Sequence, residues 1–371
     1  MSTDEQIIRR AASAAGFAFA GFSRIAPLIT REAFYARWLE QGRHGTMTYL
    51  ARDPARRFDP HALDSRFRSV VSLGWSYDPP SPSKLDWRAE LRGRIAAYAL
   101  GRDYHDYVLK AARTVAAAIE SLRSGTITRA YVDTGPVFER EWAAQARLGW
   151  FGKNTMLLTR DRGSYFFLAE IFTDYEFDAP DTPYREHCGT CRQCLDLCPT
   201  HALEDGYVME PRKCISYLTI ENRGPIPIDL RPQIGMWLFG CDICQEVCPW
   251  NESASSAGND DLMPHLPDLM ALDDAAFGRR FTKSAIKRAK RRGLLRNAAV
   301  VMGNTGNRDA VPVLARTMEH EPEPLVRSHA AWALGELGGP AAKRALDRAH
   351  QRDIDQSVVE EAAGALERIS P

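Results

Sequence analysis

The sequence predicts an α+β protein in three parts: an N-terminal α/β domain, a ferredoxin-like domain and C-terminal HEAT-like α-helical repeats. Three observations support this division. Strand-like and amphipathic helical segments share roughly the first 180 residues, all eight cysteines fall between Cys188 and Cys248, and a motif recurs every 32 residues near the C-terminus. We place the limits of the three parts at residues 1–178, 179–251 and 252–371.

The first part combines helices with strands rich in β-branched and aromatic residues. Strands are expected over residues 17–22, 68–77, 127–133 and 165–172. A first helix, capped by Thr3 or Asp4, is expected to bury Ile7, Ile8, Ala11 and Ala15. A second helix is expected over residues 104–122, with an inward face made of Val108, Ala111, Ala112, Val115 and Ile119.

The spacing of the cysteines predicts two iron–sulfur clusters. The first run, Cys188-x2-Cys191-x2-Cys194-x3-Cys198-Pro199, matches bacterial two-cluster ferredoxins, in which the fourth cysteine ligates the other cluster. The same crossing applied to the second run leaves no cysteine unused. One [4Fe–4S] cluster then has the ligands Cys188, Cys191, Cys194 and Cys248, and the other has Cys198, Cys214, Cys241 and Cys244.

Zinc sites and disulfide bonds are the alternatives for these cysteines. Zinc also binds paired cysteines, but it suits poorly a run with three ligands on one short loop and a fourth pointing elsewhere. The N-terminal segment MSTDEQIIRR lacks the apolar core of a signal peptide, and no run of 18 apolar residues predicts a membrane span. We therefore expect a reducing, cytoplasmic location without membrane contact, where thiolates are free for metal.

The formal net charge is zero, but the charge is unevenly distributed. Nine of the 18 residues from 279 to 296 are Lys or Arg, and none is acidic. Such a segment is either a solvated helix face or a site for a polyanion. It leads into the repeated motif, which reads NAAVVMGNTG from Asn297, HAAWALGELG from His329 and EAAGALERIS from Glu361. This period predicts stacked helical hairpins whose first face must be covered by the rest of the protein.

The N-terminal domain is expected to hold the electron acceptor, because a ferredoxin core alone would not need a domain of this size. The sequence contains neither a GxGxxG turn between a strand and a helix nor a P-loop. The segment GWFGKNT, residues 149–155, could let the backbone approach a large flat ligand, or it could be a plain hairpin turn. Asp133 ends an apolar strand, where burial would raise its pKa toward that of a general acid. Alternatively, Asp133 caps the helix that begins near Pro136.

Taken together, these motifs resemble the epoxyqueuosine reductase family over nearly the whole chain. The resemblance rests on GRDYH from Gly101, YVDTGP from Tyr131, GWFGKNT, CGTCRQCLDLCPTHAL from Cys188, CISYLTIE from Cys214 and GCDICQEVCPWN from Gly240. It implies a cobalamin-dependent oxidoreductase that reduces epoxyqueuosine to queuosine at the wobble position of tRNA, the final step of queuosine biosynthesis. It also implies a cobalamin-binding N-terminal domain, a monomer, recognition of the anticodon stem-loop and an external low-potential electron donor.

The resemblance also assigns roles to individual residues. Asp133 is implied as the proton donor to the leaving oxygen. The segment Asp103-Tyr104-His105 imitates a cobalt-binding histidine motif but lacks its glycine, so we expect cobalamin to bind without a protein histidine. The cobalamin site is implied to include Arg57, Asp133, Lys153, Asn154, Leu157, Leu168, Ser216 and Asp242.

The tRNA is expected to contact the segment after Cys214 and the basic segment. Asn222 and Arg223 are candidates for the wobble region. Phosphates of the anticodon arm are expected to be neutralised by Lys283, Lys287, Arg288, Lys290, Arg291, Arg292 and Arg296.

Two other functions remain open from the sequence. A reductive dehalogenase-like enzyme would use the same cofactors on a small molecule, which the basic segment and the repeats make less favourable. An electron-transfer module would pass electrons to a partner protein without chemistry of its own, and it would contain no corrinoid.

Overall fold

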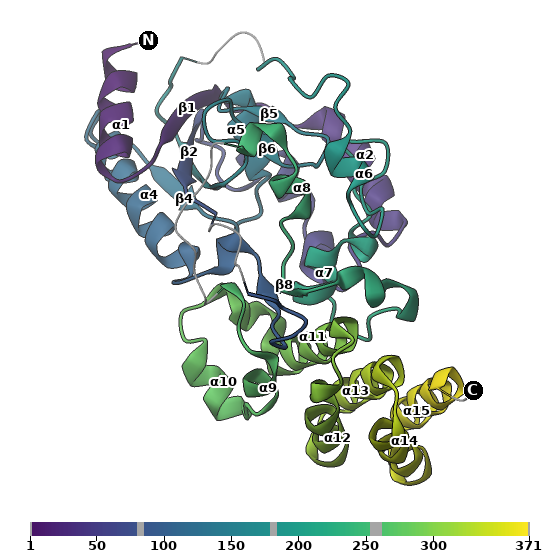
Figure 1. The fold of residues 1–371 in the computed structure, drawn as a ribbon. Coiled ribbons are helices and arrows are strands. Elements are labelled where there is room, and N and C mark those ends of the chain that lie inside the picture. The colour runs from purple at the N-terminus through teal and green to yellow at the C-terminus, as the bar shows by residue number, and fades with distance from the viewer. Residues whose placement is uncertain (1, 80–84, 179–183, 253–261, 370–371) are drawn as a thin grey trace.

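The computed structural model describes residues 2–79, 85–178, 184–252 and 262–369. The N-terminal domain and the helical repeats lie at opposite ends of the molecule (Figure 1). The short helices of the cluster domain lie alongside the N-terminal domain and lead down to the repeats. Among the described residues, no helix has both the length and the hydropathy that a membrane span requires.

The N-terminal domain is built on a four-stranded antiparallel sheet in the order β1-β2-β7-β4. Its central pair runs in register from Ser69 opposite Thr173 to Ser76 opposite Phe166. Because strand residues alternate between the two faces, Val71 and Ile171 pack under helices α1 and α4 while Phe172 packs against α5. These elements are β1 (Phe19–Arg24), β2 (Ser69–Ser76), β4 (Thr128–Tyr131), β7 (Phe166–Thr173), α1 (Thr3–Ala14), α4 (Tyr104–Glu120) and α5 (Glu139–Gln145).

All four expected strands are present, each within three residues of its expected ends. The expected inward face of the long helix is confirmed for its four fully buried members, and Ala111 is half-buried. The first helix differs from the expectation, because Ser2 is its cap and Ile8 and Ala12 form its buried stripe. Ile7, one residue earlier on the helix, is rotated toward solvent and is 38% exposed.

The cluster domain contains short elements joined by loops, and one segment of the N-terminal part crosses into it. Strand β3 (Arg94–Ile95) pairs in parallel with β8 (Trp237–Phe239). Leu91 and Ala96 consequently pack in the same core as Trp237. The predicted domain limits stay a prediction, but residues 91–99 belong physically to the later part. The other cluster-domain elements are α6 (Gln193–Asp196), α7 (Ile215–Ile220) and α8 (Ile243–Glu246).

Several smaller elements complete the fold around the site. Strands β5 (Trp150–Phe151) and β6 (Leu157–Leu158) form an antiparallel hairpin, so the plain hairpin interpretation of GWFGKNT describes its shape correctly. The remaining helices before the repeats are α2 (Ile29–Glu40), α3 (Ala55–Phe58), α9 (Leu266–Met270) and α10 (Asp274–Arg280).

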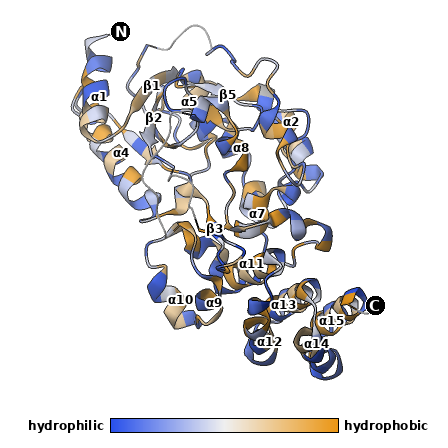
Figure 2. Ribbon diagram, in the orientation of Figure 1, coloured by the Kyte–Doolittle hydropathy of each residue, from blue (hydrophilic) through white to orange (hydrophobic). Residues whose placement is uncertain are grey.

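The repeats form five helices in which the three copies of the motif fall on α11, α13 and α15, as the 32-residue period predicts. These helices pack side by side, and their apolar residues face inward (Figure 2). The cluster domain covers the first face, where α11 is almost wholly buried. The bounds are α11 (Lys290–Thr305), α12 (Val311–His320), α13 (Pro324–Leu337), α14 (Pro340–Arg352) and α15 (Gln356–Ile369).

Candidate active site and cluster sites

The eight cysteines are free thiols that approach one another in two groups. Burial raises the pKa of Cys194 to about 11, with further contributions from Cys248, Cys188 and Cys191. Burial likewise raises the pKa of Cys244, and the nearby thiols of Cys214, Cys194 and Cys198 raise it further. Thiols of the two runs thus approach one another, and the crossed ligand sets stay a prediction. We call Cys188, Cys191, Cys194 and Cys248 the outer group, and Cys198, Cys214, Cys241 and Cys244 the inner group.

Cys191 of the outer group is exposed, and the other seven cysteines are half-buried. Burial is the main reason why the pKa of Cys214 and of Cys241 in the inner group is raised. Within the described residues, no three metal-binding side chains gather tightly enough to hold a single ion.

Asp133 lies just after β4 in the left-handed backbone region, with a φ of 56°. Its side chain is 61% exposed, and its Oδ2 lies 3.1 Å from Nε2 of His105. Partial burial raises the pKa of Asp133, but the hydrogen bond and charge of His105 outweigh this and lower it overall. The expectation of a buried aspartate with a raised pKa is therefore wrong for this conformation. The capping alternative is also wrong, because Phe138 occupies the N-cap of α5.

His105 is a functional candidate that the sequence reasoning missed. Its Nδ1 lies 2.6 Å from Oδ1 of Asp103, and its Nε2 faces Asp133. Burial lowers the pKa of His105, but hydrogen bonds to Asp133 and Asp103 raise it overall to about 8. The imidazolium at neutral pH donates to both carboxylates. The sequence feature that could have revealed it is the segment Asp103-Tyr104-His105, in which the N-cap residue of α4 lies two positions before the histidine.

Glu139 holds the backbone of the Asp133 loop. The N–H of Asp133 donates to the Glu139 carboxyl group. Burial, followed by the nearby charge of Asp133, raises the pKa of Glu139 to about 8, so this carboxyl group is largely protonated at neutral pH. The loop is therefore held from both sides, by Glu139 through its backbone and by His105 through its side chain.

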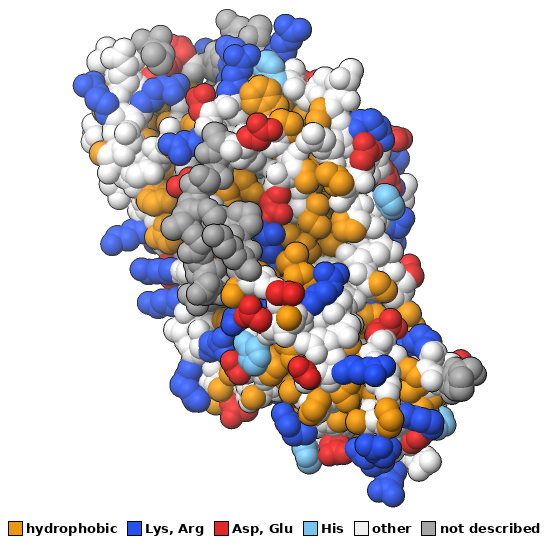
Figure 3. Space-filling model, viewed as in Figure 1, with side chains coloured by type: hydrophobic (Ala, Val, Ile, Leu, Met, Phe, Trp, Pro, Cys, Tyr) orange, Lys and Arg blue, Asp and Glu red, His pale blue; other side chains and the backbone are white. Residues whose placement is uncertain are grey.

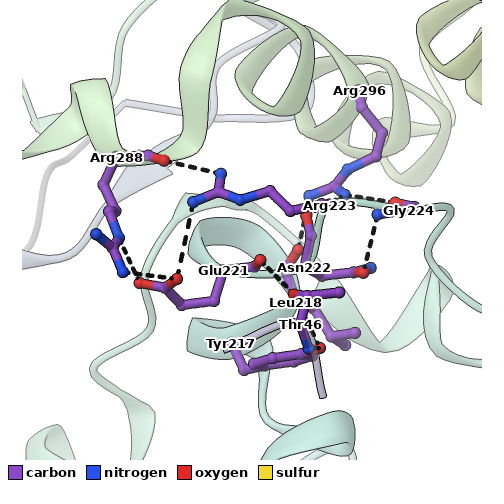
Figure 4. Close-up of polar contacts among 9 residues, drawn as sticks. All are labelled: Thr46, Tyr217, Leu218, Glu221, Asn222, Arg223, Gly224, Arg288 and Arg296. Atoms are coloured by element: carbon purple, nitrogen blue, oxygen red, sulfur yellow. Dashed lines mark hydrogen bonds and ion pairs between the residues drawn. The ribbon is translucent and has the colours of Figure 1, made fainter. Parts of the chain in front are cut away.

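Glu221, Arg223 and Arg288 form a cluster of charged groups (Figure 4), and the charge of Arg288 contributes to lowering the pKa of Asp133. Arg288 donates to both Glu221 oxygens at 2.7 and 3.1 Å, and its guanidinium lies over the Tyr49 ring at 5.2 Å. Arg223 donates to the backbone oxygen of Arg288 at 2.8 Å. Both arginines thus face the carboxylate of Glu221, and this cluster forms one side of the site.

The structure corrects two of the expected phosphate contacts. Arg296 is 1% exposed and donates to backbone oxygens of Leu218, Asn222 and Gly224 (Figure 4). Arg291 is also buried and pairs with Glu321. Both lie on the inward side of α11, so the prediction that they bind phosphates is wrong.

The other basic residues remain available to an anion. Lys283, Lys287, Lys290 and Arg292 are exposed, and within the described chain the three lysine side chains make no hydrogen bond or ion pair. The backbone oxygen of Lys283 accepts from the N–H of Asp103 at 2.7 Å, which places the start of this segment beside the His105 helix cap. Lys and Arg side chains project along the edges of the face in Figure 3, while hydrophobic side chains gather in its middle.

The residues expected to hold cobalamin come from both the N-terminal domain and the cluster domain. Burial raises the pKa of Tyr98, and the charges of Asp133, Asp242 and Glu221 raise it further. Asp242 is buried, accepts from the N–H of Ala97 at 2.7 Å and has its pKa raised by burial to about 6.

The remaining cobalamin candidates fall into two kinds. Asn154 is buried and donates to the oxygen of Cys244 at 3.1 Å, and Lys153 donates to the oxygens of Gly189 and Cys191 at 2.6 and 2.8 Å. Leu157 is buried, whereas Leu168 and Ser216 are half-buried. Nε of Arg57 is buried and, among the described atoms, has no partner, which suits a polar group of a ligand.

Three protein-family models match successive parts of the chain, in the same order as its three structural parts. A model described as "Epoxyqueuosine reductase QueG, DUF1730" matches residues 57–134. A 4Fe-4S double cluster binding domain matches residues 187–251, and HEAT repeats match residues 282–367.

Whole-chain relatives are similar over most of their length. The epoxyqueuosine reductase of Pseudomonas aeruginosa is 41% identical over 87% of this chain and 91% of its own. That of Xanthomonas campestris is 40% identical over 89% and 95%.

Solved structures of similar fold carry the same description. A selenomethionine-labelled epoxyqueuosine reductase superimposes with a TM-score of 0.90, 29% identity and 99% of both chains covered. A second, with an epoxyqueuosine-modified tRNA-Tyr stem loop, has a TM-score of 0.89, 29% identity and 98% of both chains covered. A third, from Bacillus subtilis, has an aspartate catalytic loop swung out of the active site (TM-score 0.89, 29% identity, 99% and 98% covered).

Proposed function

The chain belongs to the epoxyqueuosine reductase family, and we propose that it reduces epoxyqueuosine at the wobble position of tRNA to queuosine. The observation that carries this proposal is the matching fold of a relative that holds an epoxyqueuosine-modified tRNA stem loop. Identity of about 40% over most of the chain favours this function over small-molecule reduction or simple electron transfer.

The enzyme uses cobalamin and two [4Fe–4S] clusters. When bound, cobalamin supplies a low-valent cobalt centre for the two-electron reduction, which together with two protons converts the epoxide to an alkene and water. Arg57, Ser216 and Leu168 are the candidates that retain exposed or unpaired groups for it. The inner group lies beside Asp242, at the proposed cobalamin site.

Electrons are proposed to enter at the outer group, where Cys191 reaches the surface. A small external carrier with a low potential could approach this side of the chain. The remaining path to the inner group lies within the cluster domain. All the cysteines and Asp133 come from one chain, which supports the proposal of a monomer, and a tRNA substrate favours the cytoplasm.

Asp133 is the proposed proton donor to the leaving oxygen. In the open site its carboxylate shares a proton with His105, which holds that proton at Nε2. Binding of a substrate excludes water, and desolvation favours the neutral carboxylic acid. The proton can then pass from His105 to Asp133 and onward to the oxygen as the carbon–oxygen bond breaks. The left-handed backbone and Glu139 keep the carboxyl group directed toward His105.

The basic segment is proposed to bind the anticodon arm. Its exposed members are Lys283, Lys287, Lys290 and Arg292, and the first of them adjoins the cap of the His105 helix. Phosphates held there would bring the neighbouring nucleotides close to Asp133. Asn222 and Arg223 are proposed as wobble-region contacts because their loop lies beside Glu221 and Arg288 (Figure 4).

The test uses anaerobically reconstituted protein and tRNA that carries epoxyqueuosine, with nucleosides identified by mass spectrometry. We expect queuosine from the wild type and a loss of roughly 100-fold or more in Asp133→Asn, the usual contribution of a general acid. Iron and cobalamin contents should be unchanged in that variant. Asp106→Asn is the matched control, because Asp106 lies on the same surface and pairs only with Arg102 among described groups. Full activity of Asp133→Asn would remove the proposed acid, and no queuosine from the loaded wild type would remove the proposed function.

A further inference from the structure

Trp150 is packed between the two chain segments that supply the outer group. Its ring lies edge-on to His187, which precedes Cys188, and to Trp250, which follows Cys248, at centroid distances of 4.9 and 5.1 Å. The indole Nε1 is buried, and among the described atoms it has no conventional hydrogen-bond partner. Within the described chain, a buried N–H without a conventional partner therefore lies between the segments that carry Cys188 and Cys248.

Lys153, in the same hairpin, adds a positive charge beside the outer group. Its ammonium donates to the oxygens of Gly189 and Cys191, at 2.6 and 2.8 Å. The hairpin therefore brings the indole N–H of Trp150 and one positive charge to the segments that supply the outer group.

The inner group has a different electrostatic environment. Asp242, which directly follows Cys241, is a buried carboxylate. Backbone N–H groups of Ile243, Ser216 and Tyr217 donate to thiols of this group, so N–H donors are common to both groups. The hairpin loop reaches the inner group through the uncharged amide of Asn154, which donates to the oxygen of Cys244. The negative charge of Asp242 disfavours an additional electron on a cluster here, whereas a positive charge favours one at the outer group.

We propose that Trp150 and Lys153 raise the reduction potential of the outer [4Fe–4S] cluster, so that the external donor fills this cluster before the inner one. Accepting one electron makes a cluster more negative, and N–H donors and a cation stabilise that reduced form. The two residues tune a potential and touch no substrate. The proposal rests on the outer ligand set proposed above and assigns the GWFGKNT hairpin a role at the clusters.

The experiment is a redox titration of the full chain, followed by electron paramagnetic resonance. The outer signal is identified as the one altered in Cys191→Ala. We expect Trp150→Phe, which keeps an aromatic ring but removes the indole N–H, to shift the outer midpoint potential to a more negative value. Lys153→Met should shift it the same way, while Lys153→Arg, which keeps the charge, should remain near the wild type. The inner midpoint potential should not move in these variants.

Arg192→Met is the matched control for charge. Arg192 directly follows Cys191 and is a more exposed cation than Lys153, paired with Asp196. Solvent therefore screens its charge, and little shift of the outer midpoint potential is expected. The proposal is overturned if the outer midpoint is unchanged in Trp150→Phe at full iron content, or if only the inner midpoint moves. If Lys153→Met fails to retain iron, the outer midpoint potential of Trp150→Phe decides whether the proposal holds. The titration needs neither tRNA nor cobalamin, so its outcome is separate from that of the epoxide assay.

Discussion

His105 and Asp133 act as a pair whose shared proton belongs mainly to the histidine. A lone carboxylate as exposed as Asp133 would be a weak general acid at neutral pH. In the proposed mechanism the neighbouring imidazolium supplies the missing proton, and Asp103 on its other side holds the ring in place. Asp133 could be proposed as the acid from the sequence, but its partner could not, because the contact joins residues 28 positions apart.

The pair predicts a dependence of the rate on pH. Because the pKa of His105 is raised to about 8, the imidazolium is present below that pH and is lost above it. The rate of epoxide reduction should therefore fall as the pH rises through about 8. His105→Gln should be slower and should lack this alkaline fall, measured as single-turnover rates between pH 6 and 9.5.

Glu139→Gln provides the control for the pH profile, because the pKa of Glu139 is also raised to about 8. The amide can still accept the N–H of Asp133, so this variant should keep the alkaline fall. A fall that persists in His105→Gln but vanishes in Glu139→Gln would transfer the proton-holding role to Glu139.

Helix α11 is the element in which sequence and structure differ most. Its basic residues read as one surface, yet the helix is the first of the repeats and its inner side faces the cluster domain. Arg296 satisfies three backbone oxygens of the 218–224 segment, and Asn297 donates to Thr219 and Leu238. Amino-acid composition cannot distinguish a buried structural arginine such as Arg296 from an arginine that binds phosphate, because both kinds occur in basic segments.

The buried side of α11 predicts a loss of stability in Arg296→Met. Removing the guanidinium leaves one buried and two partly buried carbonyl groups without their donor, at about 1–3 kcal/mol for a fully buried group and less for the others. We expect a free-energy loss of about 3 kcal/mol or more and a lower Tm of the cluster-loaded protein, measured by circular dichroism. Lys290→Met, at an exposed position of the same helix, should change the stability by no more than about 0.5 kcal/mol. Equal Tm values for the two variants would contradict the structural role of Arg296.

The exposed side of the basic segment predicts a salt-dependent contribution to tRNA binding. Reversal of Lys283, Lys287, Lys290 and Arg292 to Glu should weaken binding and reduce the log–log salt slope by roughly 0.7–0.9 for each lost phosphate contact. Filter binding over a range of salt concentrations measures both effects. Lys343→Glu on α14 is the control, because that exposed lysine already pairs with Asp347. An unchanged affinity in the fourfold variant would make the segment a solvated face.

At the scale of the whole molecule, the order of the parts followed from the sequence, but their connections did not. The cysteine spacing and the 32-residue period are local signals, and both describe the structure correctly. The pairing of β3 with β8 joins segments more than 140 residues apart and involves only two residues of β3, so no periodicity reveals it. The two cysteine runs are joined in a similar long-range way.

Crossed ligation makes each cluster depend on both cysteine runs, and single cysteine variants can test this. Cys194 lies near Cys248 of the second run, and Cys244 lies near Cys198 of the first. Cys248→Ala should therefore disrupt the outer cluster, and Cys198→Ala the inner one, each lowering the iron content from about eight toward four. The signal affected in Cys248→Ala should be the one affected in Cys191→Ala. If Cys248→Ala instead alters the same signal as Cys241→Ala, each run holds its own cluster and the crossed sets are wrong.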